Sequence, residues 1–272
     1  MKYTLHNHTY LCKHASGDAF EMVDEALSKG YDLIGVSDHI PYPDAEVMYR
    51  MDFNQKALYL NELKLVKEKY ALQPVRILCG FEAEYQVRHL DYLKGLFINK
   101  EIDYLVLGQH YQDVADLRTY YGRIDNIKLV KQYVDECIEA FKTNLFWIFV
   151  HPDIFLMSFT TIDQEIINEC TRLIKAANEY QVLLEYNAGG VRFGLSRHLK
   201  QDQYPYPKKF FWQLVEKLNG QVVVNADAHS PQHINDIALK LAVQQAQELN
   251  LNLVEPDYDN YYQRVKTTLK IK

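Results

Sequence analysis

The chain opens on a short β-prone run that ends in two histidines, His6 and His8, which are separated by one residue. Side chains two positions apart on a strand point to the same side, so both imidazoles can face one metal ion. Two imidazoles make only half of a four-coordinate metal site. The remaining ligands must therefore come from later segments of the chain.

Similar residues follow each of the later apolar, β-branched runs. The expected strands span residues 2–6, 32–37, 75–80, 104–108, 147–150, 182–186 and 221–225. The polar residues at their ends are His6, His8, Asp38, His39, Glu82, Glu84, His110, His151, Glu185, Asn187, Asp227 and His229. Because the carboxyl ends of parallel strands open on one face of a barrel, we expect these side chains to converge there.

Helical patterns separate the strands, over residues 18–29, 52–70, 91–97, 126–142, 161–180, 207–218 and 234–249. Most of the strands are continuously apolar, as parallel strands buried on both faces are. This alternation predicts an α/β fold with a closed or nearly closed parallel barrel. No linker rich in Gly, Ser or Pro interrupts it, so we expect one domain over residues 1–272. Two long stretches, 40–51 and 188–206, are expected to be non-helical and either functional or disordered.

Composition narrows the class of protein. The net charge of −6 and the pI of about 5.9 argue against nucleic acid as a partner. No apolar run approaches the roughly 18 residues that a membrane span needs. The four cysteines form no CxxC pair, and the N-terminus runs straight into a strand instead of a signal peptide. These features predict reduced thiols and a cytoplasmic location.

The ligand types indicate the metal. Histidine nitrogen combined with carboxylate oxygen suits Zn²⁺, Mn²⁺ or Fe²⁺, whereas Mg²⁺ and Ca²⁺ sites do not need this many imidazoles. The strand ends offer more ligands than one ion can bind, so we expect two or three divalent ions that share bridging carboxylates. Glu82 and Asp227 are the best bridging candidates.

Other residues near the strand ends have less certain roles. His14 and Asp18 are further candidate ligands in the loop and helix start after the first strand, and Cys12 lies close enough in sequence to contact a metal. Glu84 is expected to be structural, and Asp38 could orient a neighbouring imidazole. The histidines away from strand ends, which are expected to be solvated or hydrogen-bonded, are His89, His198 and His233.

The ordered motifs resemble those of the polymerase and histidinol phosphatase (PHP) superfamily. The matching motifs are His6-x-His8-Thr9, Asp38-His39, Gly80-Phe81-Glu82, His110, His151-Pro152 and Asp227-x-His229. They extend over nearly the whole chain, and the ordered set is far more specific than any one motif. The resemblance implies a distorted seven-stranded parallel (β/α)7 barrel, similar to a TIM barrel, with a metal-dependent active site at the C-terminal ends of the strands.

Two further segments are similar to the histidinol-phosphate phosphatase branch of that superfamily. The stretch 11–14, Leu-Cys-Lys-His, is similar to the branch's Phe-Cys-Pro-His but departs from it at Leu11 and Lys13. The stretch 185–188, Glu-Tyr-Asn-Ala, with Tyr206-Pro207 downstream, is similar to the branch's Glu-x-Asn-Thr, and Ala188 replaces the threonine.

The resemblance implies three metal sites. The first would use His6, His8, Glu82 and Asp227, the second Glu82, His110 and His151, and the third His39 and His229 with His14 or Asp18. The implied reaction is hydrolysis of L-histidinol phosphate to L-histidinol and phosphate, the phosphatase step of histidine biosynthesis. A hydroxide that bridges two metal ions would attack phosphorus, and no side-chain nucleophile is required.

The substrate needs contacts beyond the metal ions. Arg197, Arg192 or Arg118 could bind the phosphate bidentately. Glu185 and Asn187 could bind the amino or imidazole end of the substrate. Asp227, His229 and His39 are the candidates to supply the proton that the leaving alkoxide needs.

Two alternatives remain for the activity. The first is another PHP-type phosphoesterase, such as a 3′–5′ exonuclease or a nucleotide phosphatase. The second is an amidohydrolase-type enzyme, which the sequence Gly108-Gln109-His110 disfavours because it lacks the modified lysine common after the fourth strand of that class. A small phosphate ester is thus the expected partner, without nucleic acid or membrane, and a homo-oligomeric state is compatible with the sequence.

Overall fold

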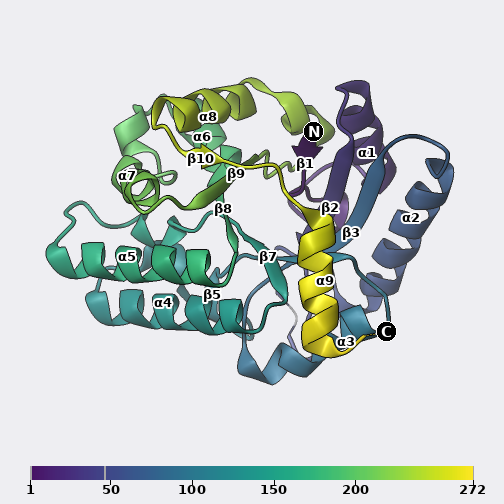
Figure 1. Ribbon diagram of the computed structural model, residues 1–272, viewed down its shortest axis with the longest axis horizontal. Helices are drawn as coiled ribbons and strands as arrows, with labels where there is room; N and C mark the ends of the chain where they lie inside the picture. The colour runs from purple at the N-terminus through teal and green to yellow at the C-terminus, as the bar shows by residue number, and fades with distance from the viewer. Residues whose placement is uncertain (1, 46, 272) are drawn as a thin grey trace.

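Eight parallel strands form one curled sheet in the computed structural model, which describes residues 2–45 and 47–271 and, for residues 116–118, the backbone only (Figure 1). Along the sheet they are β1 (Tyr3–Thr4), β2 (Leu33–His39), β3 (Arg76–Ala83), β4 (Tyr104–Leu107), β7 (Phe146–Phe149), β8 (Leu183–Asn187), β9 (Gln221–Asn225) and β10 (Asn252–Leu253). The first seven correspond to the predicted strands. The two-residue β10 was not predicted, because so short a strand has no recognisable pattern.

The two sides of the curled sheet meet at one end of the barrel. Asn7, after β1, forms an isolated parallel bridge with Ala228, after β9. In this bridge the His8 N–H donates to the Ala228 carbonyl over 2.8 Å, and the Ala228 N–H donates to the His6 carbonyl over 3.2 Å. β10 pairs instead with the first residues of β9, at the other end. The predicted distorted parallel barrel is confirmed, and its closure lies beside His6 and His8.

The barrel interior is filled by a large side chain. Tyr104 on β4 points inward, and its hydroxyl donates to the Leu5 carbonyl over 2.8 Å. A Cβ atom on Gly35 would lie 2.2 Å from the Tyr104 oxygen, and one on Gly80 would lie 2.4 Å from the Tyr104 ring. These two glycines therefore make the space in which Tyr104 packs, which leaves room for polar chemistry only above it, at the carboxyl ends of the strands.

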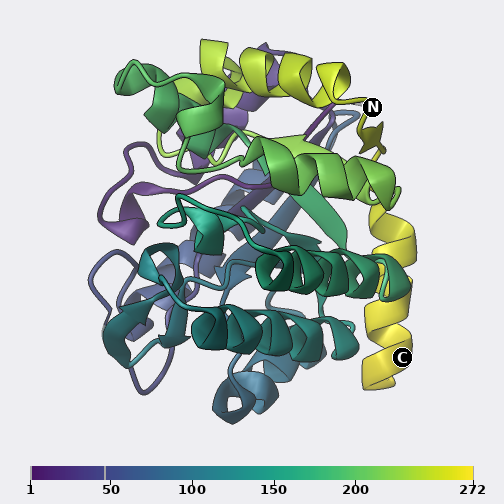
Figure 2. The same cartoon turned by 90° about the vertical axis from the view of Figure 1, so that its left-hand side faces the viewer.

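Helices cover the outside of the sheet (Figure 2). They are α1 (Ala19–Ser28), α2 (Lys56–Lys69), α3 (Leu90–Ile98), α4 (Ile127–Lys142), α5 (Gln164–Glu179), α6 (Ala188–Ser196), α7 (Lys209–Lys217), α8 (Ile237–Glu248) and α9 (Tyr258–Leu269). Six of them begin after an Asp or Asn whose side chain accepts a hydrogen bond from the first turn, namely Asp18, Asn126, Asp163, Asn187, Asp236 and Asp257. Within the described ranges, no helix has the length and apolar character that crossing a bilayer requires.

The prediction that residues 188–206 are non-helical is wrong. Asn187 caps α6, which occupies the first half of that stretch. Gly189 and Gly190 in the first turn lower the helix propensity and so obscured the helix in the sequence. Gly190 is needed there, because a Cβ atom on it would lie 2.1 Å from the Tyr206 carbonyl oxygen.

Two other elements were also not predicted. A hairpin of β5 (Tyr111–Asp113) and β6 (Asp116–Tyr120) follows β4. The C-terminal helix α9 covers the amino ends of the strands, where the Tyr261 hydroxyl accepts from the Leu105 N–H and donates to the Leu145 carbonyl. Figure 2 shows α9 at the opposite side of the barrel from the purple loop that follows β1. One end of the barrel is thus closed by a helix, and the other carries the polar residues.

Candidate metal centre

The carboxyl ends of the strands bring the predicted polar residues around one cavity of about 540 Å³. Its lining includes His14, His39, Glu82, His110, His151, Asp227 and His229. His6 and His8 lie fully buried at its base and contact Glu82 and Asp227. Reading only the residues after each strand therefore predicted which side chains meet in space.

The carboxylates of Glu82 and Asp227 both approach the ring nitrogens of His6 and His8. His6 Nε2 lies 3.1 Å from His8 Nε2, 3.4 Å from Glu82 Oε2 and 3.5 Å from Asp227 Oδ1. His8 Nε2 lies 3.5 Å from Glu82 Oε2 and 3.4 Å from Asp227 Oδ1. Ligands of a tetrahedral Zn²⁺ ion, each about 2.0–2.1 Å from the metal, are separated by roughly 3.3 Å. The spacing of His6, His8 and Asp227 fits a single divalent ion, and Glu82 lies beside the same two imidazoles.

The contacts and ionisation of the Glu82 carboxylate also fit a bound metal ion. Its Oε2 atom is buried and, within the described part of the chain, accepts no hydrogen bond of good geometry, although His39 Nδ1 lies 2.9 Å away. A buried carboxylate oxygen is costly unless a nearby cation offsets its charge. Burial alone would raise the pKa of Glu82, but the imidazoles of His39, His110 and His6 hold it well below its ordinary value. The carboxylate is therefore ionised at neutral pH and available as a ligand.

The other oxygen of Glu82 faces a second group of imidazoles. Glu82 Oε1 lies 2.9 Å from His151 Nε2 and 3.3 Å from His110 Nε2. Space for this oxygen is provided by Gly108, because a Cβ atom there would lie only 2.0 Å from Glu82 Oε1. A carboxylate that faces separate ligand groups with its two oxygens has the geometry of a metal bridge.

A third group of imidazoles lies nearer the mouth of the cavity. His14, His39 and His229 can together offer atoms to one ion. His14 Nε2 is 2.9 Å from His229 Nε2, and His39 Nδ1 is 2.9 Å from Glu82 Oε2. Of the two alternatives for this site, the structure brings His14 into the group. The Asp18 carboxylate instead caps α1, where it accepts from the Glu21 N–H over 2.8 Å.

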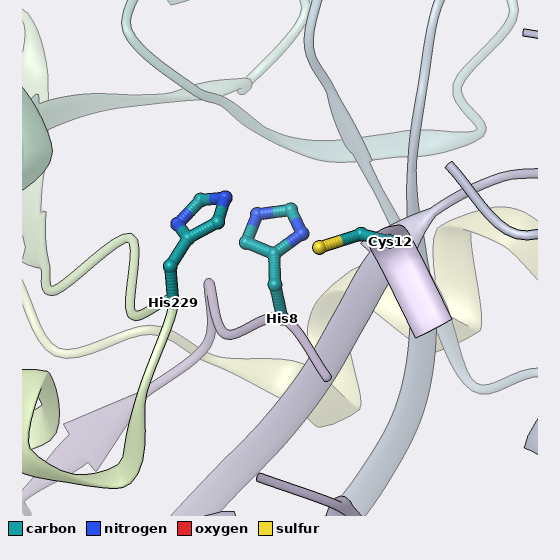
Figure 3. Close-up of side chains that lie close together, drawn as sticks. All are labelled: His8, Cys12 and His229. Atoms are coloured by element: carbon teal, nitrogen blue, oxygen red, sulfur yellow. The ribbon is translucent and has the colours of Figure 1, made fainter. Parts of the chain in front are cut away.

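Cys12 lies beside the buried histidines, as Figure 3 shows. The sulfur of Cys12 and nitrogens of His8 and His229 all lie within 4.8 Å of one another. Cys12 is fully buried, and burial together with the nearby Asp38 raises the pKa of its thiol to about 12. Only a thiolate is a good metal ligand. The protonated thiol is therefore a weaker candidate than the imidazoles around it.

Asp38 and Glu84 support the histidines from behind. Asp38 accepts from the Thr9 N–H over 3.1 Å and from the His39 N–H over 2.8 Å, and its Oδ1 lies 3.5 Å from His8 Nδ1. Its carboxylate therefore faces the His8 ring. Glu84 Oε1 lies 3.2 Å from His110 Nδ1, and the two oxygens Oε1 and Oε2 accept from the buried Arg50 guanidinium over 2.9 and 3.0 Å. Glu84 has the structural role that was predicted for it.

The predicted phosphate contacts of Arg192 and Arg197 do not agree with the structure. The Arg192 Nε donates to Asp236 over 2.7 Å, and its other nitrogens donate to the Ala226 carbonyl, so this guanidinium fixes α6 to its neighbours. Arg197 is exposed, lies over the Phe193 ring, and does not line the cavity. Both residues lie on or beside the helix α6 and neither side chain lines the cavity, although Arg192 also donates to the Asp227 backbone carbonyl over 3.4 Å. The side chain of Arg118 lies outside the described residues.

The predicted substrate contacts of Glu185 and Asn187 are also corrected. Both side chains are fully buried, at 0% and 1% exposure, and neither lines the cavity. They contact His6, the His151 backbone and Asp227 instead. The sequence indicated correctly that they point toward the site, but not that other site residues lie between them and the cavity.

The sequence interpretation missed several residues that line the cavity. They are Tyr49, Arg50, Tyr111 and Arg123, and Tyr120 and Tyr206 line it as well. Arg123 is exposed toward the cavity and, within the described part of the chain, forms no ion pair. The run Tyr120-Tyr121-Gly122-Arg123 was the available signal, because it combines aromatic rings and a guanidinium after a strand end. It was overlooked because the β5–β6 hairpin that delivers it was not predicted.

Comparison with known proteins gives a consistent result. Residues 4–189 match the model of the PHP domain. A protein of Schizosaccharomyces pombe named "probable histidinol-phosphatase" is 21% identical over 260 residues, which cover 86% of this chain and 82% of that protein. A protein of Deinococcus radiodurans with the same name is 25% identical over 235 residues, 83% of this chain and 85% of that protein.

A solved structure has the same fold. It is the histidinol phosphate phosphatase from Lactococcus lactis, determined in complex with zinc, L-histidinol and phosphate. The TM-score is 0.69 with 14% sequence identity, over 93% of this chain and 95% of the other. At this identity the likeness establishes the fold only.

Proposed function

Since this chain belongs to the PHP domain family, we propose that it is a metal-dependent phosphomonoester hydrolase whose substrate is L-histidinol phosphate. The products are L-histidinol and phosphate, and the reaction belongs to histidine biosynthesis. The observation that carries the proposal is Glu82, a buried carboxylate whose two oxygens face separate groups of imidazoles. The names of the two relatives and the ligands of the L. lactis structure support the choice of substrate.

The proposed ligands fall into three groups that share Glu82. One ion would be held by His6, His8, Glu82 and Asp227, a second by Glu82, His110 and His151, and a third by His14, His39 and His229. The chemistry of the donors suits zinc, manganese or iron, which when bound supply Lewis acidity and an activated water for attack on phosphorus. The protein's own contribution is to keep Glu82 and Asp227 ionised, since nearby imidazoles hold the pKa of both well below the ordinary value despite their burial.

Arg123 is the proposed phosphate contact. It lines the same cavity as Glu82, and no described carboxylate pairs with it. A guanidinium can bind two phosphoryl oxygens at once, which orients the ester and neutralises charge that develops in the transition state. Arg118 comes from the same segment and remains a second candidate. Asp227, His229 and His39 all line the cavity. Each could take a proton from water and pass it to the leaving alkoxide, and they remain the candidates for this role.

The histidinol part of the substrate would pack against tyrosine rings. Tyr49, Tyr111, Tyr120 and Tyr206 surround the cavity beyond the metal centre. Aromatic faces pack well against a planar imidazole such as that of histidinol. The volume of about 540 Å³ lies within the range of roughly 300–1,000 Å³ typical of small-molecule sites.

The same metal centre would also serve another PHP-type phosphoesterase. A 3′–5′ exonuclease or nucleotide phosphatase is disfavoured by the net charge of −6, because binding of nucleic acid is driven by cationic surfaces. An amidohydrolase-type reaction is disfavoured because Gly108, at the end of β4, packs against Glu82 and leaves no room for a modified lysine.

The test is phosphate release by the purified chain after loading with Zn²⁺ or Mn²⁺. L-Histidinol phosphate, nucleoside monophosphates and short oligonucleotides would be compared at equal concentration. We expect the highest kcat/KM for L-histidinol phosphate and complete loss of activity after dialysis against a strong chelator. A higher kcat/KM for a nucleotide would overturn the choice of substrate, and chelator-resistant activity would overturn the metal dependence.

A further inference from the structure

A buried acid–amide pair on β8, Glu185 and Asn187, joins residues of two proposed metal positions. β8 lies between β7 and β9 in the sheet. His151 follows the first of these neighbours and Asp227 follows the second. Neither member of the pair lines the cavity, and both are completely buried. Any effect they have on the site must therefore pass through other residues.

Glu185 contacts a residue of each position. Its Oε1 lies 2.9 Å from His6 Nδ1, and its Oε2 accepts from the His151 backbone N–H over 3.2 Å. A carboxylate can only accept, so His6 must carry its proton on Nδ1. The lone pair of His6 Nε2 then faces Glu82 and Asp227, as a metal ligand requires.

Asn187 extends the same network to Asp227. Its Nδ2 donates to Glu185 Oε2 over 2.6 Å and to Asp227 Oδ2 over 3.2 Å. Its Oδ1 accepts from the Gly190 N–H and so caps α6. With Oδ2 bound in this way, Asp227 presents its other oxygen, Oδ1, to His6 and His8.

The backbone makes this support necessary. His151 and Asp227 adopt positive φ angles of 33° and 46°, which are unfavourable for residues other than glycine. Such a conformation persists only where surrounding contacts hold it. The pair holds His151 by its N–H and Asp227 by its carboxylate, on the two sides of β8.

We propose that Glu185 and Asn187 are positioning residues that couple two metal positions, so that loss of Glu185 weakens metal binding at both. These two inner positions are the one formed by His6, His8, Glu82 and Asp227 and the one formed by Glu82, His110 and His151. The proposal rests on the metal use stated under Proposed function but not on the identity of the substrate. Glu84, by comparison, contacts only His110 among the proposed ligands and would support one position.

The decisive measurement is Zn²⁺ affinity by competition with a chromogenic chelator, together with metal content, on Glu185→Gln. We expect both inner equivalents to bind about 10–100-fold more weakly, the usual cost of losing a partner of a metal-bound histidine. Glu62→Gln is the matched control, because Glu62 is a partly buried acid that accepts from the Ala19 N–H, outside the metal centre. Weakening of one equivalent only, or wild-type affinity, would overturn the coupling.

A second variant separates coupling from a local defect. A Cβ atom on Gly189 would lie 2.6 Å from Asp227 Oδ2 and 2.8 Å from Asn187 Oδ1, so Gly189→Ala should displace Asp227 and disturb Asn187 without contacting Glu185 directly. We expect Gly189→Ala to weaken the equivalent that uses Asp227 more than the one that uses His151. If it weakens both equally while Asn187→Ser keeps wild-type affinity, the positions communicate without the pair and the proposal is wrong.

Asn187→Ser provides an independent measurement if Glu185→Gln does not fold. Serine keeps a hydroxyl that can cap α6 but removes the Nδ2 donor to Glu185 and Asp227. Circular dichroism of the metal-free protein would verify folding. We expect weaker Zn²⁺ binding, and wild-type affinity would contradict the positioning role of Asn187. Because no substrate is used, the result does not depend on whether L-histidinol phosphate is hydrolysed.

Discussion

The metal centre has a buried inner group and an exposed outer group that are built differently. The inner group consists of His6, His8, Glu82, His151 and Asp227, none more than 8% exposed, together with the half-buried His110. The outer group consists of His14, His39 and His229, which are exposed or half-buried. In the inner group, His6 is fixed by Glu185 and Asp227 by Asn187. In the outer group, His14 Nε2 and His229 Nε2 face each other at 2.9 Å.

The two groups also differ in charge. Among inner residues, Asp227 and Asp38 outweigh the effect of burial and raise the pKa of His8 to about 9. In the outer group, burial lowers the pKa of His39 to about 4 and also lowers the pKa of His229. The outer imidazoles of His39 and His229 also contact acids, at 2.9 and 3.4 Å, but there burial outweighs the effect of those acids on the pKa. The fold prepares the inner group for cations, and we expect the outer group to bind an ion more weakly.

The largest effect is expected from Glu82→Ala, because Glu82 belongs to the inner group and also contacts His39 of the outer group. Loss of a residue that only orients a ligand costs about 10–100-fold, so loss of a bridging ligand should cost more than about 100-fold in kcat/KM. Metal content should fall at more than one position. The measurement is phosphate release together with elemental analysis, with Glu62→Gln as the control. A variant that keeps near-wild-type metal content and rate would show that Glu82 is not the bridge.

The contrast also explains what the sequence could and could not predict. Ligand types and their order follow from local patterns, because each strand end is marked by an apolar run and the barrel brings those ends together. The sequence predicted Glu82 as a bridging ligand and Glu185 as a substrate contact, but it did not show that Glu185 faces His6 instead of the cavity. Which of them faces an ion and which faces another ligand depends on strand register and packing.

The sequence also failed to predict segments whose structure depends on tertiary contacts. Arg192 and Arg197 were predicted to bind phosphate because residues 188–206 were expected to be a loop. The helix α6 forms because Asn187 caps it, and its glycines fit against Tyr206 and Asp227. Those contacts are tertiary, so helix propensity alone could not reveal them.

A smaller effect is expected from His14→Ala, which tests whether His14 is a ligand of the outer group. Removing one of three ligand imidazoles should weaken one Zn²⁺ equivalent by at least the ~10–100-fold that loss of a ligand's orienting partner costs, and leave the inner equivalents unchanged. Asp18→Ala is the matched variant, because Asp18 caps α1 and should cost only about 1 kcal/mol of folding stability. Chelator competition and thermal unfolding would separate the two. Metal loss in Asp18→Ala with full retention in His14→Ala would reverse the assignment.

Arg123→Ala tests the mouth of the cavity without changing any proposed ligand. Loss of a charged hydrogen bond to phosphate costs about 1.5–3 kcal/mol, so we expect KM to rise about tenfold or more. Metal content should remain that of the wild type. Arg197→Ala is the control, since Arg197 lies over Phe193 and outside the cavity. The interpretation fails if Arg197→Ala raises KM and Arg123→Ala does not.

The smallest effect is expected from Cys12→Ala, which asks whether the thiol belongs to either group. Its sulfur is close enough to His8 and His229 for all three to bind one ion. Burial and Asp38 raise the pKa of the thiol to about 12, so binding an ion there requires removal of a proton that the surroundings retain. Zn²⁺ affinity and kcat/KM should therefore stay close to wild-type values, with Cys12→Ser as a control for packing. A loss of one Zn²⁺ equivalent, as expected for His14→Ala, would instead place Cys12 among the ligands of the outer group.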